Sequence, residues 1–210
     1  MVREIGHNHV FIVSDEGMVK SGIVKKVLSI LENDGIATDL FTDVIADPPE
    51  RVVHSAVNAA KIVKTNIVIG LGGGSSLDVA KLVALLVPEN QSLAEAYGVG
   101  NAIGPRLPLI LIPTTAGTGS EVTPISIITT GESEKMGVVS PIIIPDIAVL
   151  DPLLTITVPK HITAATGIDA MVHAIEGYAS ANKNNNPISK MLAIEALKLL
   201  GGSIEKAVFE

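Results

Sequence analysis

The sequence contains no cysteine and no tryptophan among its 210 residues, and aromatic side chains make up only 2% of it. The absence of cysteine excludes disulfides and thiolate metal sites, so a metal ion can be held only by oxygen atoms and imidazole nitrogens. The shortage of aromatic residues means that the core is built from valine, isoleucine, leucine and alanine.

Long hydrophobic runs are also lacking, although hydrophobic residues make up 47% of the chain and the mean hydropathy is +0.48. Stretches such as Leu82–Val87 and Leu107–Ile112 are far too short to cross a bilayer. The apolar run Val10–Val13 is too short for a signal peptide. We therefore expect a cytoplasmic protein without a membrane partner.

Positive charge is not in excess either, because 22 acidic residues face 15 lysines and arginines, for a net charge of −7. A surface of this sign disfavours binding to nucleic acid and to anionic membranes. The expected partners are therefore small molecules.

Short β-branched runs alternate with amphipathic stretches over the first two thirds of the chain, which is typical of an α/β fold with a parallel sheet. The sequence then becomes alanine-rich and helical after Asp151-Pro152. We expect an α/β domain over residues 1–158 and the first helices of a second domain over 159–210. The pattern predicts strands at 10–13, 38–41, 66–69, 109–112, 125–130 and 136–140, and helices at 17–33, 49–64, 76–87, 160–180 and 187–200.

A glycine-rich turn, Gly70–Asp78, follows the third predicted strand and opens a helix. Its bare backbone amides can approach a phosphate at the positive end of that helix. The strict dinucleotide fingerprint fails, because Ser75 stands where its third glycine belongs. A tight strand-to-helix connection, capped by Ser75 or Ser76, is an equal alternative.

A second polar cluster, Pro113–Thr123, follows the fourth predicted strand and is rich in small and hydroxyl-bearing residues. Such residues let a chain pass close to a ligand and donate hydrogen bonds to it, although a solvated loop is the commoner explanation of one cluster alone. The two clusters support each other, because ligands of open α/β sheets bind at the carboxyl ends of the strands.

Asp169 and His173 lie one turn apart on a predicted helix, where a carboxylate and an imidazole can hold one metal ion. A surface pair without a metal is the alternative. Two donors seldom complete a metal site.

Taken together, these three motifs resemble the iron-containing (group III, metal-dependent) alcohol dehydrogenase family in their order, spacing and content. The resemblance covers nearly the whole chain. It implies a Rossmann-like NAD(P)-binding domain followed by the beginning of an all-helical domain, on a dehydroquinate synthase-like scaffold. It also implies a divalent metal, Fe²⁺ or Zn²⁺, held first by Asp169 and His173.

The same resemblance implies a set of cofactor-binding residues and assigns no catalytic residue. Thr42 stands where family members often carry an acidic residue that binds the adenosine ribose, which leaves NADP open beside NAD. The implied cofactor-binding residues are Thr42, Gly73, Gly74, Ser75, Asp78, Thr114, Thr115, Thr118 and Lys135.

The implied reaction is the interconversion of a primary alcohol and an aldehyde by hydride transfer. Because the family's remaining metal ligands are histidines beyond this motif, the chain is expected to be truncated, with an incomplete metal site. Helices without their partners are then expected to self-associate or to form a mobile C-terminal segment, or the chain to form a homodimer. The alternatives are a glycerol dehydrogenase-like polyol oxidoreductase, a dehydroquinate synthase relative and a non-catalytic nucleotide-binding fragment.

Overall fold

The computed structural model of the protein describes residue 2 and residues 8–210. They form two compact units: the first runs to Thr114 and resumes over Ser120–Leu154, and the second comprises Thr115–Gly119 and Thr155–Glu210. The division at residue 158 that the sequence suggests stays a prediction.

The first unit is built on a five-stranded sheet of β1 (His9–Asp15), β2 (Ala37–Val44), β3 (Ile67–Gly72), β5 (Leu109–Pro113) and β8 (Ile147–Ala148). The strands are all parallel, in the order β2-β1-β3-β5-β8. The four strands that the sequence predicts between residues 10 and 112 are thereby confirmed, and so is the α/β class.

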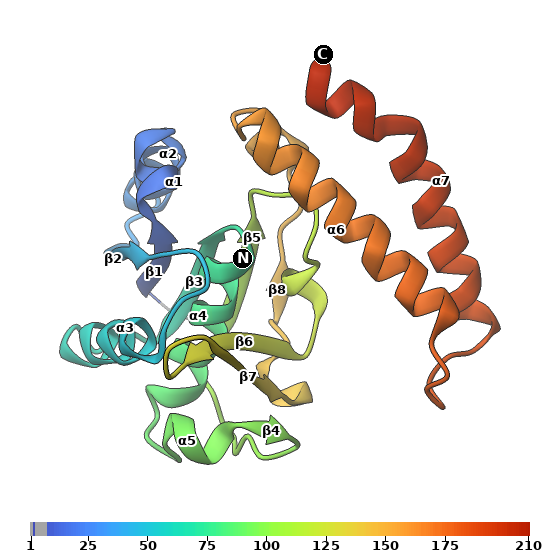
Figure 1. The fold of residues 1–210 in the computed structure, drawn as a ribbon. Coiled ribbons are helices and arrows are strands. Elements are labelled where there is room, and N and C mark those ends of the chain that lie inside the picture. Colours follow the sequence, from blue (N-terminus) through green and yellow to red (C-terminus); the bar gives the residue numbers. More distant parts are fainter. Residues whose placement is uncertain (1, 3–7) are drawn as a thin grey trace. The chain divides into compact units, whose positions relative to one another are not determined.

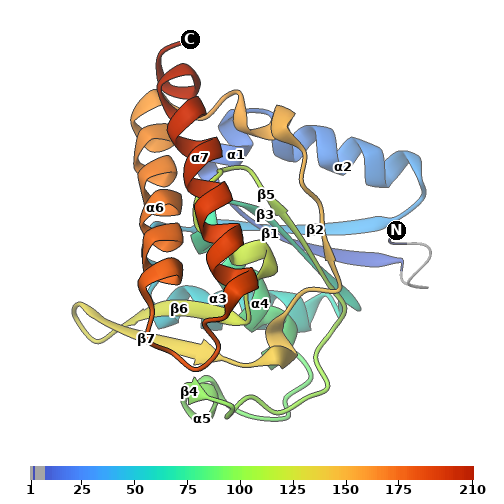
Figure 2. The same ribbon diagram turned by 90° about the vertical axis from the view of Figure 1, so that its right-hand side faces the viewer.

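Alternate side chains of β1 enter two different cores. Val10 and Ile12 belong to one cluster, and Phe11 and Val13 belong to the other. Figure 2 shows α1 (Glu16–Lys20) and α2 (Ile23–Asn33) on one face of the sheet and α3 (Glu50–Ile62) and α4 (Gly74–Leu86) on the other. The buried members of both clusters are aliphatic apart from Phe11 and Phe41, as the composition predicts.

Two predicted helix boundaries are wrong. The stretch 17–33 is not one helix, because Gly22 takes the left-handed conformation with φ of 78° and separates α1 from α2. In the second unit, α7 (Pro187–Phe209) continues through Gly201-Gly202 instead of ending at residue 200. Glycine permits a break in a helix but does not impose one, so composition alone misplaces both boundaries.

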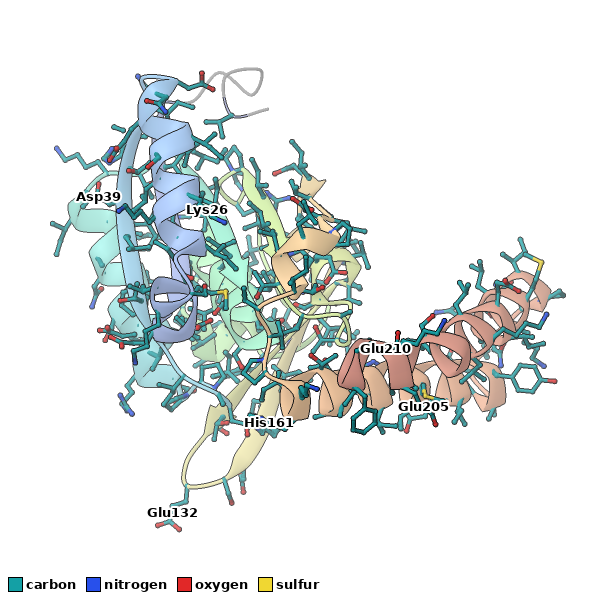
Figure 3. All side chains as sticks on the ribbon, turned by 90° about the horizontal axis from the view of Figure 1, so that it is seen from above. Lys26, Asp39, Glu132, His161, Glu205 and Glu210 are labelled. Carbon is teal, nitrogen blue, oxygen red and sulfur yellow. The ribbon has the colours of Figure 1, made fainter. Side chains whose placement is uncertain are left out.

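A small second sheet, also in the first unit, has the order β4-β7-β6. It confirms the two later predicted strands as β6 (Ile125–Thr130) and β7 (Glu134–Val139), which pair antiparallel, with Glu132 at the tip of their hairpin (Figure 3). The remaining short elements are α5 (Leu93–Ala96), β4 (Gly98–Val99) and the 3-10 turns η1 (Ser120–Val122), η2 (Pro141–Ile143) and η3 (Pro152–Thr155).

In the second unit, α6 (Lys160–Ala179) and α7 lie side by side as an antiparallel pair (Figure 1). Asn186 caps α7 by accepting hydrogen bonds from the amides of Ile188 and Ser189. Much of the apolar surface of this helix pair is exposed, including Ile168, Val172, Ile175, Met191, Leu192 and Leu199. In the described part of the chain, no helix combines the length and the hydropathy needed to cross a bilayer.

An ion pair joins the segments that lead into β5 and β8. Arg106 Nη1 donates to Asp146 Oδ2 over 2.8 Å, and the Leu109 amide donates to the same oxygen over 2.7 Å. Burial raises the pKa of Asp146, but the hydrogen bonds and the charge of Arg106 outweigh it and hold the pKa below the ordinary value of 3.8.

This ion pair predicts a pH dependence of stability. Because the pKa of Asp146 is depressed on folding, its contribution is fully present above pH 3.8 and is lost as the pH falls below that value. Asp146→Asn removes this contribution at neutral pH, so the melting temperature of the variant should be lower than that of the wild type at pH 7. The difference between the two melting temperatures should disappear toward pH 2. Thermal unfolding across this range measures it, and a pH-independent gap would contradict the assignment.

Candidate nucleotide and metal site

The sheet has a topological switch point between β1 and β3. From β1 the chain passes to β2 on one side, and then returns to β3 on the other. Open α/β sheets bind ligands at such a point, beyond the carboxyl ends of the strands. Asp15 ends β1 and Gly72 ends β3, so these two residues border the candidate site.

The glycine-rich turn leaves no room for a side chain at Gly72. Its φ is 147°, and an added Cβ would lie 2.8 Å from Ser76 Oγ and 2.9 Å from Asp15 Oδ2. Gly73 is the N-cap of α4 and offers no side-chain hydrogen bond. The alternative in which Ser75 or Ser76 caps this helix is therefore wrong, and the first amides of α4 are left without a side-chain cap. Amides in this position can bind a phosphate, and the cofactor roles of Gly73, Gly74 and Ser75 stay predictions.

Asp15 is a site residue that the sequence reasoning missed. Its Oδ1 accepts a hydrogen bond of 3.1 Å from the Met18 amide and so caps α1, and its Oδ2 accepts one of 3.0 Å from Ser76 Oγ. An aspartate between a strand and a helix is a typical N-cap, and this signal could have placed it at the strand end. The result is a carboxylate directly against the glycine-rich turn.

Thr114 opens the hydroxyl-rich segment and is bonded to the same turn. Its amide donates to the Gly72 carbonyl over 2.9 Å, next to the end of β3. The side chain is fully buried, and within the described residues its Oγ1 has no hydrogen-bond partner. A buried hydroxyl without a partner is unfavourable, so this atom marks a place where a bound ligand can supply the missing bond.

Thr115 and Thr118 fall in the second unit. There Thr115 lines a cavity of about 360 Å³ together with Thr163 and Thr166 of α6 and Lys206 of α7. Their predicted contact with the cofactor is not tested and stays a prediction.

The structure does not bring every predicted residue to the turn. Asp78 points into a buried network, where it accepts hydrogen bonds from Ser120 Oγ at 2.5 Å and from the Ile127 amide at 3.0 Å. Lys135 on β7 pairs with Asp47 and donates to Thr129 Oγ1. The cofactor roles of Asp78 and Lys135 stay predictions.

Thr42 lies in the carboxyl-terminal half of β2 and is partly exposed. The neighbouring Asp43 is in register with Asp15 of β1. Two carboxylates therefore lie near this edge of the sheet, although Thr42 itself carries none.

Asp169 and His173 lie together on α6, with 3.7 Å between Asp169 Oδ1 and His173 Nε2 and both side chains about half exposed. One oxygen and one imidazole nitrogen suit a divalent metal such as Fe²⁺ or Zn²⁺. Over residues 8–210, however, no group of three or more histidine, aspartate or glutamate side chains is arranged to hold a metal. The pair therefore fits part of a metal site.

Two family models match the chain. One, described as "Iron-containing alcohol dehydrogenase", matches residues 1–152, and the other, described as "Fe-containing alcohol dehydrogenase family, C-terminal", matches residues 163–210. The two matches follow one another along the chain without overlap.

Individual relatives agree with these matches. Long-chain-alcohol dehydrogenase 1 of Geobacillus thermodenitrificans is 43% identical over 213 residues, covering 99% of this chain and 52% of that protein. NAD-dependent methanol dehydrogenase of Bacillus methanolicus is 34% identical over 208 residues, covering 99% of this chain and 54% of that protein.

A solved structure also matches closely. Sulfoacetaldehyde reductase from Bifidobacterium kashiwanohense, in complex with NAD+, superposes with a TM-score of 0.91 at 35% identity, covering 100% of this chain and 55% of that one. The chain thus spans about half the length of the relatives that it matches.

Proposed function

The chain belongs to the iron-containing alcohol dehydrogenase family, and from that premise we propose that it forms the NAD-binding part of a metal-dependent oxidoreductase that interconverts a primary alcohol and an aldehyde. The observation that carries the proposal is the turn at the end of β3. It combines a crowded glycine, uncapped helix amides and the unpartnered Thr114 hydroxyl. The amides and the hydroxyl are left unused unless a ligand binds there, and the glycine keeps the backbone of the turn bare.

The chain's own residues have distinct tasks in this reaction. When bound, the cofactor would supply the hydride acceptor and the metal would supply a Lewis acid for the alcohol oxygen. Gly73 and Gly74 present backbone amides to the pyrophosphate, and Thr114 Oγ1 hydrogen-bonds the same ligand. Asp169 and His173 contribute two donors to the metal, so the remaining donors would come from outside the described residues.

NAD is favoured over NADP by Asp15. Its carboxylate lies against Ser76 and the turn, where an additional phosphate dianion would be repelled. This argument outweighs the missing carboxylate at Thr42, which left NADP open. Two relatives point the same way, because one is an NAD-dependent methanol dehydrogenase and the structure of the other is a complex with NAD+.

A second candidate is a fragment that binds the nucleotide without turnover. The observation that favours it is that, within residues 8–210, Asp169 and His173 on α6 are not joined by a third metal donor. A homodimer, self-association through the exposed helix faces and a cytoplasmic location are further proposals, and the particular alcohol or aldehyde is left open.

Calorimetric titration of the 210-residue chain with NADH and NADPH tests the proposal. We expect NADH to bind at micromolar strength and NADPH more weakly. In Asp15→Asn, the ratio of the Kd for NADPH to the Kd for NADH should fall about tenfold, because the carboxylate that repels the additional phosphate is removed. Asparagine keeps the cap of α1, so the variant isolates the effect of charge.

Three outcomes of this titration are decisive. Binding of neither nucleotide would refute the cofactor site. Equal binding of both by the wild type would refute the role of Asp15 alone. Binding that strengthens markedly when Zn²⁺ is added would contradict an incomplete metal site, since two donors hold a metal weakly.

A further inference from the structure

Lys81 is a fully buried lysine on α4, in the helix that begins at the glycine-rich turn. Its Nζ donates to Ser120 Oγ over 2.8 Å, to Thr123 Oγ1 over 3.4 Å and to the Ile125 carbonyl over 2.6 Å. An ammonium group has three donors, and all three are used. The lysine thus ties α4 to the end of the hydroxyl-rich segment, at Ser120 and Thr123, and to the first residue of β6, Ile125.

Asp78, one turn earlier on α4, completes the network. Its Oδ1 lies 3.6 Å from Lys81 Nζ and accepts the Ser120 hydroxyl, so Ser120 bridges the two charges. Asp78 also accepts from the Ile127 amide at 3.0 Å, and its own carbonyl accepts from Ser126 Oγ at 3.0 Å. Six side-chain hydrogen bonds therefore fasten residues 120–127 to this helix.

Hydrophobic stabilisation does not explain this network. Most of the other buried residues of α4 are aliphatic, and an aliphatic side chain at position 81 would avoid the cost of burying a charge. Burial lowers the pKa of Lys81 and raises that of Asp78, because the protein interior disfavours the charged form of each group. A buried ion pair that costs stability can be retained because it fixes one arrangement of the chain.

The arrangement fixed here involves both parts of the nucleotide site. The glycine-rich turn opens α4, and Ser120 lies in the second half of the hydroxyl-rich segment Pro113–Thr123. The start of that segment is bonded to the turn through the Thr114 amide and the Gly72 carbonyl. Its far end is bonded to α4 through Ser120 and Lys81.

We propose that Lys81 is a positioning residue for the nucleotide: through Ser120 it holds the first-unit part of the hydroxyl-rich segment, Thr114 and Ser120–Thr123, in register with the glycine-rich turn. The inference rests on the proposed function, because it assumes that both elements contact the same ligand. Lys81 does not touch the ligand itself. Its loss should therefore weaken nucleotide binding through the order of Thr114 and residues 120–127, while the overall fold persists.

Lys81→Met tests the inference, with Lys61→Met as a matched control on α3, where Lys61 forms a surface ion pair with Glu89. At a temperature where both variants are folded, we expect the Kd for NADH to rise about tenfold or more in Lys81→Met only. Hydrogen exchange should quicken over residues 120–127 and remain unchanged in α2. A merely structural role would accelerate exchange throughout and leave the Kd of the folded protein unaltered.

Chemical rescue isolates the ammonium group, because the chain has no native cysteine. In Lys81→Cys, the single thiol can be alkylated in the unfolded state with 2-bromoethylamine, with loss of bromide, and the protein then refolded. This restores an ammonium at nearly the length of lysine, whereas 1-bromopropane gives a neutral side chain of equal length. The aminoethylated protein should regain wild-type affinity and the propylated protein should not.

The outcomes separate the inference from the proposed function. If the wild type fails to bind NADH, the proposed function is refuted and the inference falls with it. If the wild type and Lys81→Met bind equally, or the two alkylated proteins do, the inference alone is overturned. The alkylated pair keeps the test valid even where Lys81→Met does not fold.

Discussion

Gly72→Ala is expected to raise the Kd for NADH by about 100-fold or more and to lower the melting temperature. The new methyl group would lie within 3 Å of Ser76 Oγ and Asp15 Oδ2, and the φ of 147° is one that alanine rarely adopts. Backbone strain of this kind costs about 1–3 kcal/mol, and overpacking adds a similar amount. Ser76 Cβ, also 2.9 Å from the added methyl group, is held by the backbone of α4 and cannot rotate away, so the turn must move and the close approach that a phosphate needs is lost. Calorimetric titration and thermal unfolding measure the two effects.

Gly35→Ala is the matched control for this prediction. Gly35 also has a positive φ, 70°, but an added Cβ would meet nothing within 4 Å. It should therefore lose stability through backbone strain alone and bind NADH normally. Equal loss of affinity in both variants would show that Gly72 acts through stability and not through close approach.

The glycine-rich turn was predictable because its signal is local. Consecutive glycines between a β-branched run and a helical pattern predict a turn whose backbone can come close to a ligand, and this prediction does not depend on the rest of the fold. The pairing of Asp15 with Ser76 was not predictable in the same way. It joins residues far apart in the sequence, and only the parallel pairing of β1 with β3 brings them together.

The direction of a side chain was harder to predict than its presence in a motif. Asp78 belongs to the glycine-rich motif, but the structure turns it toward Ser120 and Ile127. A signal did exist: Asp78 and Lys81 share one face of a helix whose other residues are nearly all apolar. Opposite charges in such a run indicate a buried, paired network rather than a solvated face.

For the metal pair Asp169 and His173, the sequence predicts the pairing of the two residues but not the remaining metal donors. Helical spacing predicted that Asp169 and His173 lie together, and the distance of 3.7 Å confirms it. Periodicity says nothing about donors on other elements, and none of the described histidine, aspartate or glutamate side chains completes a set of three. Local geometry was therefore predictable, whereas the completeness of the site depends on tertiary structure.

Gly117→Ala should detach the segment 115–119 from α6 and raise the Kd for NADH by about 30-fold, equivalent to about 2 kcal/mol. An added Cβ would lie 2.6 Å from the Thr166 carbonyl oxygen and 2.7 Å from Thr166 Cβ. A helix backbone cannot rotate away as the end of a flexible side chain can, so the segment itself must move. Thr115 and Thr118, both predicted to contact the cofactor, would move with it. Thr166 also precedes Asp169 by one turn, which ties this contact to the metal pair.

Gly177→Ala on α6 is the matched control for Gly117→Ala, and it is expected to leave nucleotide binding unchanged. Nothing lies within 4 Å of an added Cβ there, and alanine favours a helix over glycine by about 1 kcal/mol. This variant should bind NADH normally and melt at or slightly above the wild-type temperature, whereas Gly117→Ala should show faster hydrogen exchange over residues 115–119. Unchanged affinity and exchange in Gly117→Ala would mean that the hydroxyl-rich segment binds the cofactor without support from α6. The predicted cofactor contacts would then be those of Thr114 and the glycine-rich turn, with Lys81 and Ser120 only positioning them.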